Sequence, residues 1–270
     1  MPIKVVRNAL NTRSACRSTR QKIYPGCDIL DLCGPCEAFH WADFWLPGFG
    51  RTGEPGYHCH ILAATAGLVR TISGIEVAAT HSFHDIGDGL DTLIVAGGVI
   101  SGEQACKDPA LVEWVRSMAP RVRRLASVCT GAFILAAAGL LNHRRVTTHW
   151  IFSDVLATEY PSIQVDSSLL FVRDGNIYSS GGITAGIDLA LALVEEDLGR
   201  EIALAARMMV VFPRRPGGQS QFSAYNVKYL EVRSRPEIQG QQAWILGHPG
   251  DDLSVSSLRC SSHAPIFHVE

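Results

Sequence analysis

The chain has 270 residues, 47% of them hydrophobic and 19% charged, which suits one large globular domain with a small appendage. The formal net charge of -2 excludes a general electrostatic attraction to nucleic acid or to an anionic membrane. Eight scattered cysteines without a secretory leader predict reduced thiols and a cytoplasmic location, and no apolar run is long enough to cross a bilayer.

Basic residues mark the first 22 positions, which hold six lysines and arginines and no acidic residue. An acid-poor start of this kind is compatible with a transit peptide, but its apolar face is thin, and a poorly ordered tail is the favoured interpretation. We therefore predict that residues 1–22 form an atypical basic segment before the folded domain.

Strands and helices alternate along the first half of the chain. Pro35 suits the first turn of a helix that Glu37–Trp45 continues. The apolar run Asp91–Ala96 ends in two glycines, a pattern typical of a parallel strand buried on both faces. The sequence also predicts a strand at Tyr57–Ala64, a hairpin at Leu68–Thr80 and an amphipathic helix at Pro109–Met118.

The same alternation continues in the second half. The predicted elements are a strand at Arg145–Thr148, a helix from His149 to about Tyr160, a hairpin turning at Asp174 and Gly175, and helices at Thr184–Leu198 and Glu201–Val211. Strands that alternate with helices indicate an α/β fold whose parallel sheet is covered on both faces.

A cysteine between a strand and a helix is the main functional signal. Cys129 directly follows the short apolar run Leu125–Val128, and Thr130–Ala132 opens a stretch rich in alanine and leucine that predicts a helix. A strand, a sharp turn and a helix with a nucleophile at the turn form a nucleophile elbow. The helix N-terminus favours a thiolate over a thiol, so a functional Cys129 is predicted, with a small buried turn residue as the alternative.

Five motifs in this order resemble the ThiJ/PfpI superfamily: YPGCDILDLCGP, DTLIVAGG, SVCTGAFILAAAGLL, TTHW and GGITAGIDLALALVEEDLG. The resemblance covers residues 23–223. It implies a flavodoxin-like three-layer α/β sandwich with a parallel sheet and a nucleophile elbow, which we place at residues 23–211.

Two branches of this superfamily fit the chain, and the first is the GlxA-type regulators of the AraC family. FPRRPGGQSQFS and the segment after Arg235 resemble these regulators, in which a PfpI-like domain precedes two helix-turn-helix units. This branch implies a small-molecule ligand and DNA as partners, and we expect a homodimer. Because 36 residues remain from Arg235 onwards, we predict a linker at 212–234 and a truncated remnant of the DNA-binding domain at 235–270.

The second branch is isonitrile hydratase, a resemblance that implies catalytic positions at Asp31, Cys129 and Thr130. His149 lies 20 residues after Cys129 and is either an activating base for the thiol or a structural residue at a helix start. A third interpretation is an oxidation sensor that uses Cys129. The candidate ligand-binding residues are Gly97, Gly98, Cys129, Thr130 and Asp188.

The superfamily also implies an apolar first strand directly before the YPG motif. Residues 18–23 read STRQKI here, whereas a central parallel strand is almost continuously apolar. Burying Arg20 or Lys22 unpaired would cost several kcal/mol. The sequence therefore predicts that this strand is lost.

Three weaker motifs point to no further chemistry. Cys33–Cys36 reads CGPC, but the sequence pattern of a thioredoxin domain around it is missing. Gly97–Gly98 lacks the additional glycines of a dinucleotide site. Because the histidines at positions 58, 60, 81 and 84 have no partner pair at zinc spacing, we predict no metal and no cofactor.

Overall fold

A computed structural model describes residues 17–22, 24–53, 56–85, 89–98 and 105–210 of the chain. The predicted linker at 212–234 and the predicted remnant at 235–270 lie outside the described residues. Within the described ranges, no helix is both long and apolar enough to cross a membrane.

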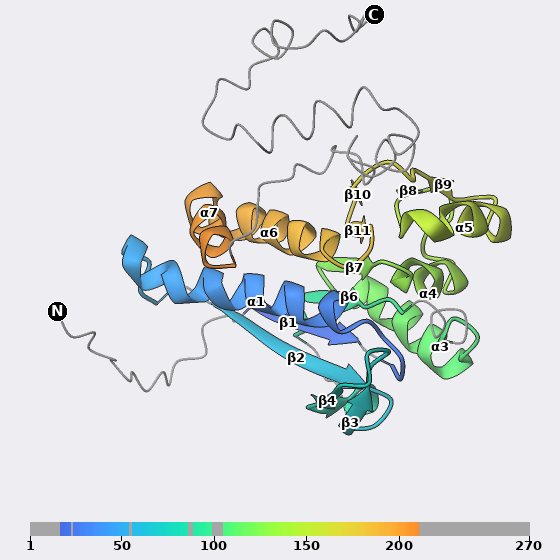
Figure 1. Cartoon of the computed structure of the whole chain (residues 1–270), viewed down its shortest axis with the longest axis horizontal. Helices are drawn as coiled ribbons and strands as arrows, with labels where there is room; N and C mark the ends of the chain where they lie inside the picture. Colours follow the sequence, from blue (N-terminus) through green and yellow to red (C-terminus); the bar gives the residue numbers. More distant parts are fainter. Residues whose placement is uncertain (1–16, 23, 54–55, 86–88, 99–104, 211–270) are drawn as a thin grey trace, which may run out of the picture. The chain divides into compact units, whose positions relative to one another are not determined.

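A seven-stranded sheet forms the centre of the described domain, in the order β10-β11-β7-β6-β1-β2-β5 (Figure 1). Neighbouring strands run parallel except for β10 and β11, which form an antiparallel hairpin. The strands are β1 (Arg17–Lys22), β2 (Tyr57–Ala63), β5 (His81–Ser82), β6 (Thr92–Val95), β7 (Arg124–Val128), β10 (Phe171–Asp174) and β11 (Ile177–Ser180).

The first strand is present, so the prediction that it is lost is wrong. β1 pairs in parallel register with β2 on one side and with β6 on the other, in the middle of the sheet. Main-chain hydrogen bonds form these pairings. At a central position of the sheet they outweigh the low intrinsic β-propensity of the residues in β1. The side chain of Thr19 is fully buried there. The folded domain therefore begins inside the predicted basic segment 1–22.

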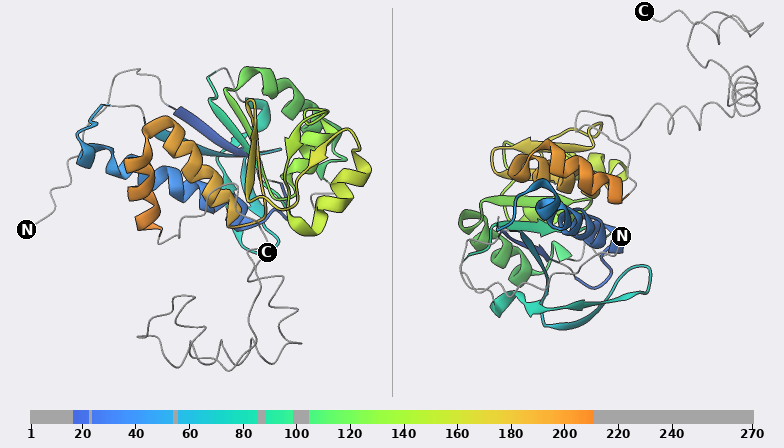
Figure 2. Two further views of the ribbon diagram at one scale, coloured as in Figure 1. Left: turned by 90° about the horizontal axis from the view of Figure 1, so that it is seen from above. Right: turned by 90° about the vertical axis from the view of Figure 1, so that its left-hand side faces the viewer.

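Helices cover both faces of the sheet and complete the predicted three-layer sandwich. On one face α1 (Ile29–Trp45), α6 (Ala185–Leu198) and α7 (Arg200–Met209) pack against one another, as Figures 1 and 2 show. On the other face lie α3 (Pro109–Met118) and α4 (Gly131–Ala137).

Strand β6 shows how this core is built. All four of its residues are buried, as predicted for a parallel strand covered on both sides. Leu93 and Val95 belong to the hydrophobic cluster with α3 and α4, whereas Ile94 belongs to the cluster with α1 and α6. Successive side chains of a strand point to opposite faces, so this short run supplies both cores.

The smaller elements also follow the predicted pattern. The predicted hairpin at Leu68–Thr80 is confirmed as β3 (Gly67–Arg70) with β4 (Glu76–Ala79). The second predicted hairpin is β10–β11, and its turn is Gly175 and Asn176, one residue later than predicted, because Asp174 still pairs with Ile177. The predicted strand at Arg145–Thr148 is shorter, because the Thr147 N–H donates to Ser179 Oγ at 2.9 Å instead of extending a ladder. The remaining elements are β8 (Arg145–Val146), β9 (Gln164–Val165), α5 (Ser153–Glu159) and the 3-10 turns η1 (Leu46–Phe49), η2 (Phe83–Asp85), η3 (Ala119–Arg121) and η4 (Trp150–Phe152).

Helix α1 begins six residues before Pro35, which corrects the predicted helix start. Proline has no N–H group, so at an interior position the helix loses one main-chain hydrogen bond. Burial of Leu32 and of Pro35 itself between the neighbouring elements offsets this loss. As a consequence Asp31 lies in the first turn of α1 and not on a loop before the helix.

Helix α3 has a carboxylate cap whose energy can be measured. Asp108 Oδ1 accepts hydrogen bonds from the N–H groups of Ala110 (3.0 Å) and Leu111 (3.3 Å). Asp108→Ala should therefore lower the free energy of unfolding by about 1 kcal/mol in urea denaturation. Asp108→Asn keeps an acceptor and should retain most of that stability. Equal stability of the alanine variant and the wild type would contradict this prediction.

Candidate functional site

Cys129 occupies the predicted elbow between β7 and α4. Its φ of +57° lies in the left-handed region, and its side chain is 1% exposed. The surrounding chain holds this strained residue: its N–H lies 3.1 Å from Ser180 O and 3.2 Å from Gly181 O, and Thr148 Oγ1 donates to its carbonyl at 2.8 Å. The elbow is therefore fixed from both β11 and the segment after β8.

Asp31 lies beside Cys129 and is fully buried. Its Oδ2 accepts a hydrogen bond from the Gly97 N–H, and its Oδ1 accepts one from the Ile183 N–H, both at 3.0 Å. A carboxylate oxygen of Asp31 lies within 4.8 Å of the Cys129 sulfur. Asp31 therefore links α1 to the loops after β6 and β11 at the carboxyl end of the sheet, where open α/β sheets bind ligands.

Burial decides the ionisation of this pair. It raises the pKa of Asp31 to about 7, with a further increase from Asp28. Burial also raises the pKa of Cys129 well above that of a free thiol, and the Asp31 carboxylate adds to the increase. The predicted preference for a thiolate is wrong, because these two effects outweigh the lowering by the Thr130 N–H and hydroxyl.

The glycines after β6 permit the close approach of these groups. A Cβ at position 97 would lie 2.7 Å from the Cβ of Cys129 and 2.8 Å from Asp31 Oδ2, so only glycine fits. The Gly98 N–H donates to Thr130 Oγ1 at 2.8 Å, and the Thr130 hydroxyl lies 3.2 Å from Gly98 O. The structure thus brings together five of the predicted residues: Asp31, Gly97, Gly98, Cys129 and Thr130.

His149 lies next to this group in the role of a helix cap. Its Nδ1 accepts from the Ile151 N–H at 3.3 Å, which is the structural alternative considered for this residue. A Cβ at Gly182 would lie 2.1 Å from His149 Cδ2, so the loop after β11 packs directly on the imidazole. Burial lowers the pKa of His149, whereas Asp28 acts in the opposite direction. Its charged neighbour in the site is therefore Asp28.

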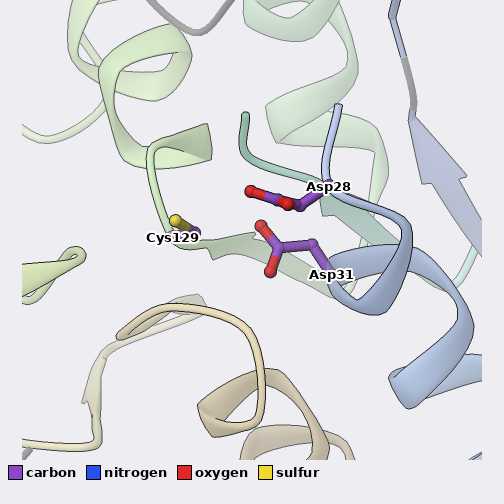
Figure 3. A group of neighbouring side chains, drawn as sticks. All are labelled: Asp28, Asp31 and Cys129. Atoms are coloured by element: carbon purple, nitrogen blue, oxygen red, sulfur yellow. The ribbon is translucent and has the colours of Figure 1, made fainter. Parts of the chain in front are cut away.

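Sequence reasoning missed Asp28 and Tyr24. Ligand atoms of Asp28, Asp31 and Cys129 all lie within 4.8 Å of one another, and Figure 3 shows the two carboxylates beside the thiol. The Tyr24 side chain is 6% exposed and interacts electrostatically with Asp31 and Cys129. Asp28 is the extended N-cap residue of α1, three residues before Asp31, and the helix start predicted near Pro35 hid this relation.

Two predicted assignments remain predictions. Asp188 is buried in the first turn of α6, and its part in ligand binding stays untested by this geometry. The expected absence of a metal also stays a prediction, although Asp28, Asp31 and Cys129 group their donor atoms closely.

The fold and the elbow define a class of protein: a three-layer, flavodoxin-like α/β domain with a buried cysteine at a nucleophile elbow. The chain belongs to the DJ-1/PfpI family, whose model matches residues 29–196. A ThiJ/PfpI family protein from Pseudomonas syringae is similar in structure, with a TM-score of 0.65 and 28% sequence identity over 79% of this chain and 80% of that one.

Relatives of two kinds share this domain. Isonitrile hydratase of Pseudomonas putida is 34% identical over 194 residues, covering 72% of this chain and 78% of the enzyme. The HTH-type transcriptional regulator GlxA of Rhizobium meliloti is 32% identical over 193 residues, covering 68% of this chain. The alignment spans 59% of that regulator, so the shared part is a little more than half of its length.

Proposed function

We propose that this chain is a GlxA-like transcription regulator of the AraC family, represented mainly by the PfpI-like domain described above. In this proposal the site around Cys129 binds a small nitrogen-containing metabolite, and the protein works in the cytoplasm as a homodimer. DNA is the partner expected for the regulator as a whole, and the described domain supplies the sensing part.

The observation that supports this proposal best is the neutral thiol at the elbow. The pKa of Cys129 is raised by burial and by Asp31, which favours the thiol over the thiolate at neutral pH. A nucleophilic cysteine needs an adjacent base or a lowered pKa. Asp31 is an adjacent carboxylate, but the pKa of Cys129 is raised and not lowered, and a buried thiol of this kind suits the lining of a binding site. Relatives that are regulators share the same domain.

The second candidate is an enzyme of the isonitrile hydratase kind, and the 34% identity to that enzyme favours it. The Cys129 sulfur would attack the terminal carbon of the isonitrile, and the thiol proton would move to that carbon through Asp31 to give a thioimidate. Water would then add to the same carbon, the C–S bond would break, and the thiol would be regenerated with release of an N-substituted formamide. Thr130 would orient the water.

One experiment separates the two candidates. With an alkyl isonitrile, the purified wild type should form no more formamide than buffer alone, measured by chromatography. In a panel of amino acids and small amides, Cys129→Ala should keep the ligand-dependent rise in melting temperature of the wild type, because the sulfur lines the site without reacting. Cys106→Ala removes a half-buried thiol elsewhere and serves as the control. Formamide formation lost only in Cys129→Ala would establish the enzyme instead.

A further inference from the structure

The CGPC sequence at Cys33–Cys36 lies inside α1, and its two middle residues pack against α6. A Cβ at Gly34 would lie 2.7 Å from Ile187 Cγ1. A Cβ at Gly186 of the same helix would lie 3.6 Å from Pro35 Cγ, an ordinary contact. The close approach of the two helices therefore accounts for the glycine and the proline of the motif, but not for its two half-buried cysteines.

The two cysteines of this motif are poorly placed to bond to each other. Both lie within α1, which begins at Ile29. Residues three apart on a helix have Cβ atoms about 5–6 Å apart, whereas a disulfide needs about 3.5–4.5 Å. A bond between Cys33 and Cys36 would therefore distort the helix.

A cysteine of strand β2, Cys59, lies opposite Cys36. Helix α1 packs against β2, and because it connects β1 to this parallel strand, it runs antiparallel to both. The rings of Phe39 and Tyr57 mark the contact, with centroids 4.6 Å apart. Cys36 lies about one turn before Phe39 on the helix. Cys59 lies two residues after Tyr57, on the same face of the strand. Both steps lead in the same direction, so the two cysteines meet beside the aromatic pair.

The electrostatics of the two thiols agree with this contact. The Cys59 thiol raises the pKa of Cys36 above its ordinary value and contributes more than burial does. Within the described part of the chain, no third histidine, cysteine or carboxylate donor joins the pair at the mutual spacing of 4.8 Å that Asp28, Asp31 and Cys129 reach. A structural zinc ion takes four ligands, so the pair suits a bond between its two sulfurs better than a metal.

We propose that Cys36 and Cys59 form a reversible disulfide, a redox modification site that ties α1 to β2. Cys59 is exposed and reacts first. Its thiolate attacks one oxygen of a hydroperoxide, the O–O bond breaks, and hydroxide departs to leave a sulfenic acid. The Cys36 sulfur then attacks the Cys59 sulfur, the S–O bond breaks, and the hydroxyl group leaves with the Cys36 proton as water. The two sulfurs have lost two electrons to the peroxide, and exchange with a small thiol returns them.

The bond acts on the helix that supplies Asp31 to the Cys129 site. Asp31 lies in the first turn of α1, less than two turns before Cys36. A covalent link from this part of the helix to the sheet restricts the motion of Asp31 relative to the elbow. Because Cys129 takes no part in the bond, the inference holds whether the site senses a ligand or catalyses a reaction.

Peptide mapping of the full chain after oxidation tests this proposal. The reduced protein is treated with hydrogen peroxide, free thiols are blocked with iodoacetamide, and the chain is digested without reductant. Mass spectrometry should find two peptides joined through Cys36 and Cys59 and lighter by two hydrogen atoms than the separate peptides. Dithiothreitol added before the digestion should remove the joined species.

Four variants identify the partners in the bond. Cys36→Ser and Cys59→Ser should each abolish the joined peptides. In Cys36→Ser the sulfenic acid should accumulate at Cys59, where dimedone traps it, because the second thiol is missing. Cys33→Ser is the matched control on the same helix and should form the bond as the wild type does. Cys129→Ser should form it too, which separates this chemistry from the elbow.

Three results would overturn the proposal. The first is a bond that is lost in Cys33→Ser and kept in Cys59→Ser, which would assign it to the CGPC pair. The second is a disulfide that joins two copies of the chain through Cys59, seen as a doubled mass without reductant. The third is oxidation of Cys59 beyond the sulfenic acid with no joined peptides. No ligand enters these measurements, so their outcome is independent of the proposed regulator function.

Discussion

Replacing Gly131 with alanine should destabilise the domain by at least about 3 kcal/mol, beyond the usual cost of a single overpacked methyl group. Gly131 is the first residue of α4, directly after the elbow. A Cβ at this position would lie 2.2 Å from the carbonyl oxygen of Val95 and 3.0 Å from its carbonyl carbon. These atoms end strand β6 in the middle of the sheet, so neither can move without breaking strand pairing. The helix must retreat instead, and the packing of Phe133 and Ile134 against the core is lost with it.

Urea denaturation followed by circular dichroism measures this loss. Gly48→Ala is the matched control, because a Cβ there meets only the ring of Trp45 at 3.4 Å, an ordinary contact on an exposed turn. We expect the control to stay within about 0.5 kcal/mol of the wild type. A Gly131→Ala variant as stable as this control would show that the elbow tolerates a wider separation of α4 from β6.

The architecture was largely predictable, because it depends on patterns that the chain carries locally. The buried run at β6, the amphipathic helix α3 and the turn directly after Asp174 each have one favoured conformation. Their alternation then leaves few arrangements other than a covered parallel sheet. The strand, turn and helix around Cys129 could be located for the same reason.

The first strand and the start of α1 were not predictable from local pattern. The composition of residues 18–23 argues against a buried strand, yet β1 lies between β2 and β6, where main-chain pairing on both sides decides. Pro35 is a frequent first-turn residue, but burial retains it inside α1. In both cases tertiary contacts outweigh a preference of about 1 to 3 kcal/mol.

The residues that form the site were predicted, but their ionisation states were not. Asp31, Cys129 and Thr130 lie together as the family resemblance implied. The state of the thiol depends on burial first and then on the Asp31 carboxylate, and neither can be judged before the position of α1 beside the elbow is known. The hydrogen bond from the Ile183 N–H to Asp31 could not be predicted either, because a main-chain donor does not depend on the residue type.

As the pH rises from about 4 to about 7, ionisation of Asp31 should lower the free energy of unfolding of the domain. Asp31→Asn should abolish this part of the pH dependence. The pKa of Asp31 is raised from 3.8 in the unfolded chain to about 7 in the folded one, so the folded state holds the proton longer. Its contribution is complete below about pH 4 and falls by about 1.4 kcal/mol per pH unit until the folded carboxyl ionises too. The total loss is about 4 kcal/mol.

Asp91 and Asp197 have the opposite effect on stability, because Arg123 and Arg124 lower the pKa of these carboxyls despite their burial. The stability that they contribute is lost only as the pH falls below about 4. Urea denaturation at several pH values between about 4 and 8, for the wild type and Asp31→Asn, isolates the contribution of Asp31 as the change in their difference with pH. The asparagine also sets an amide against the N–H groups of Gly97 and Ile183, which costs a constant amount at every pH. Asp154→Asn, at an exposed position of α5, should show the pH dependence of the wild type. The prediction is wrong if the difference in the free energy of unfolding between wild type and Asp31→Asn does not vary with pH. Asp31 would then have the same pKa in the folded and unfolded chains, and the carboxyl beside the Cys129 thiol would be fully ionised at neutral pH.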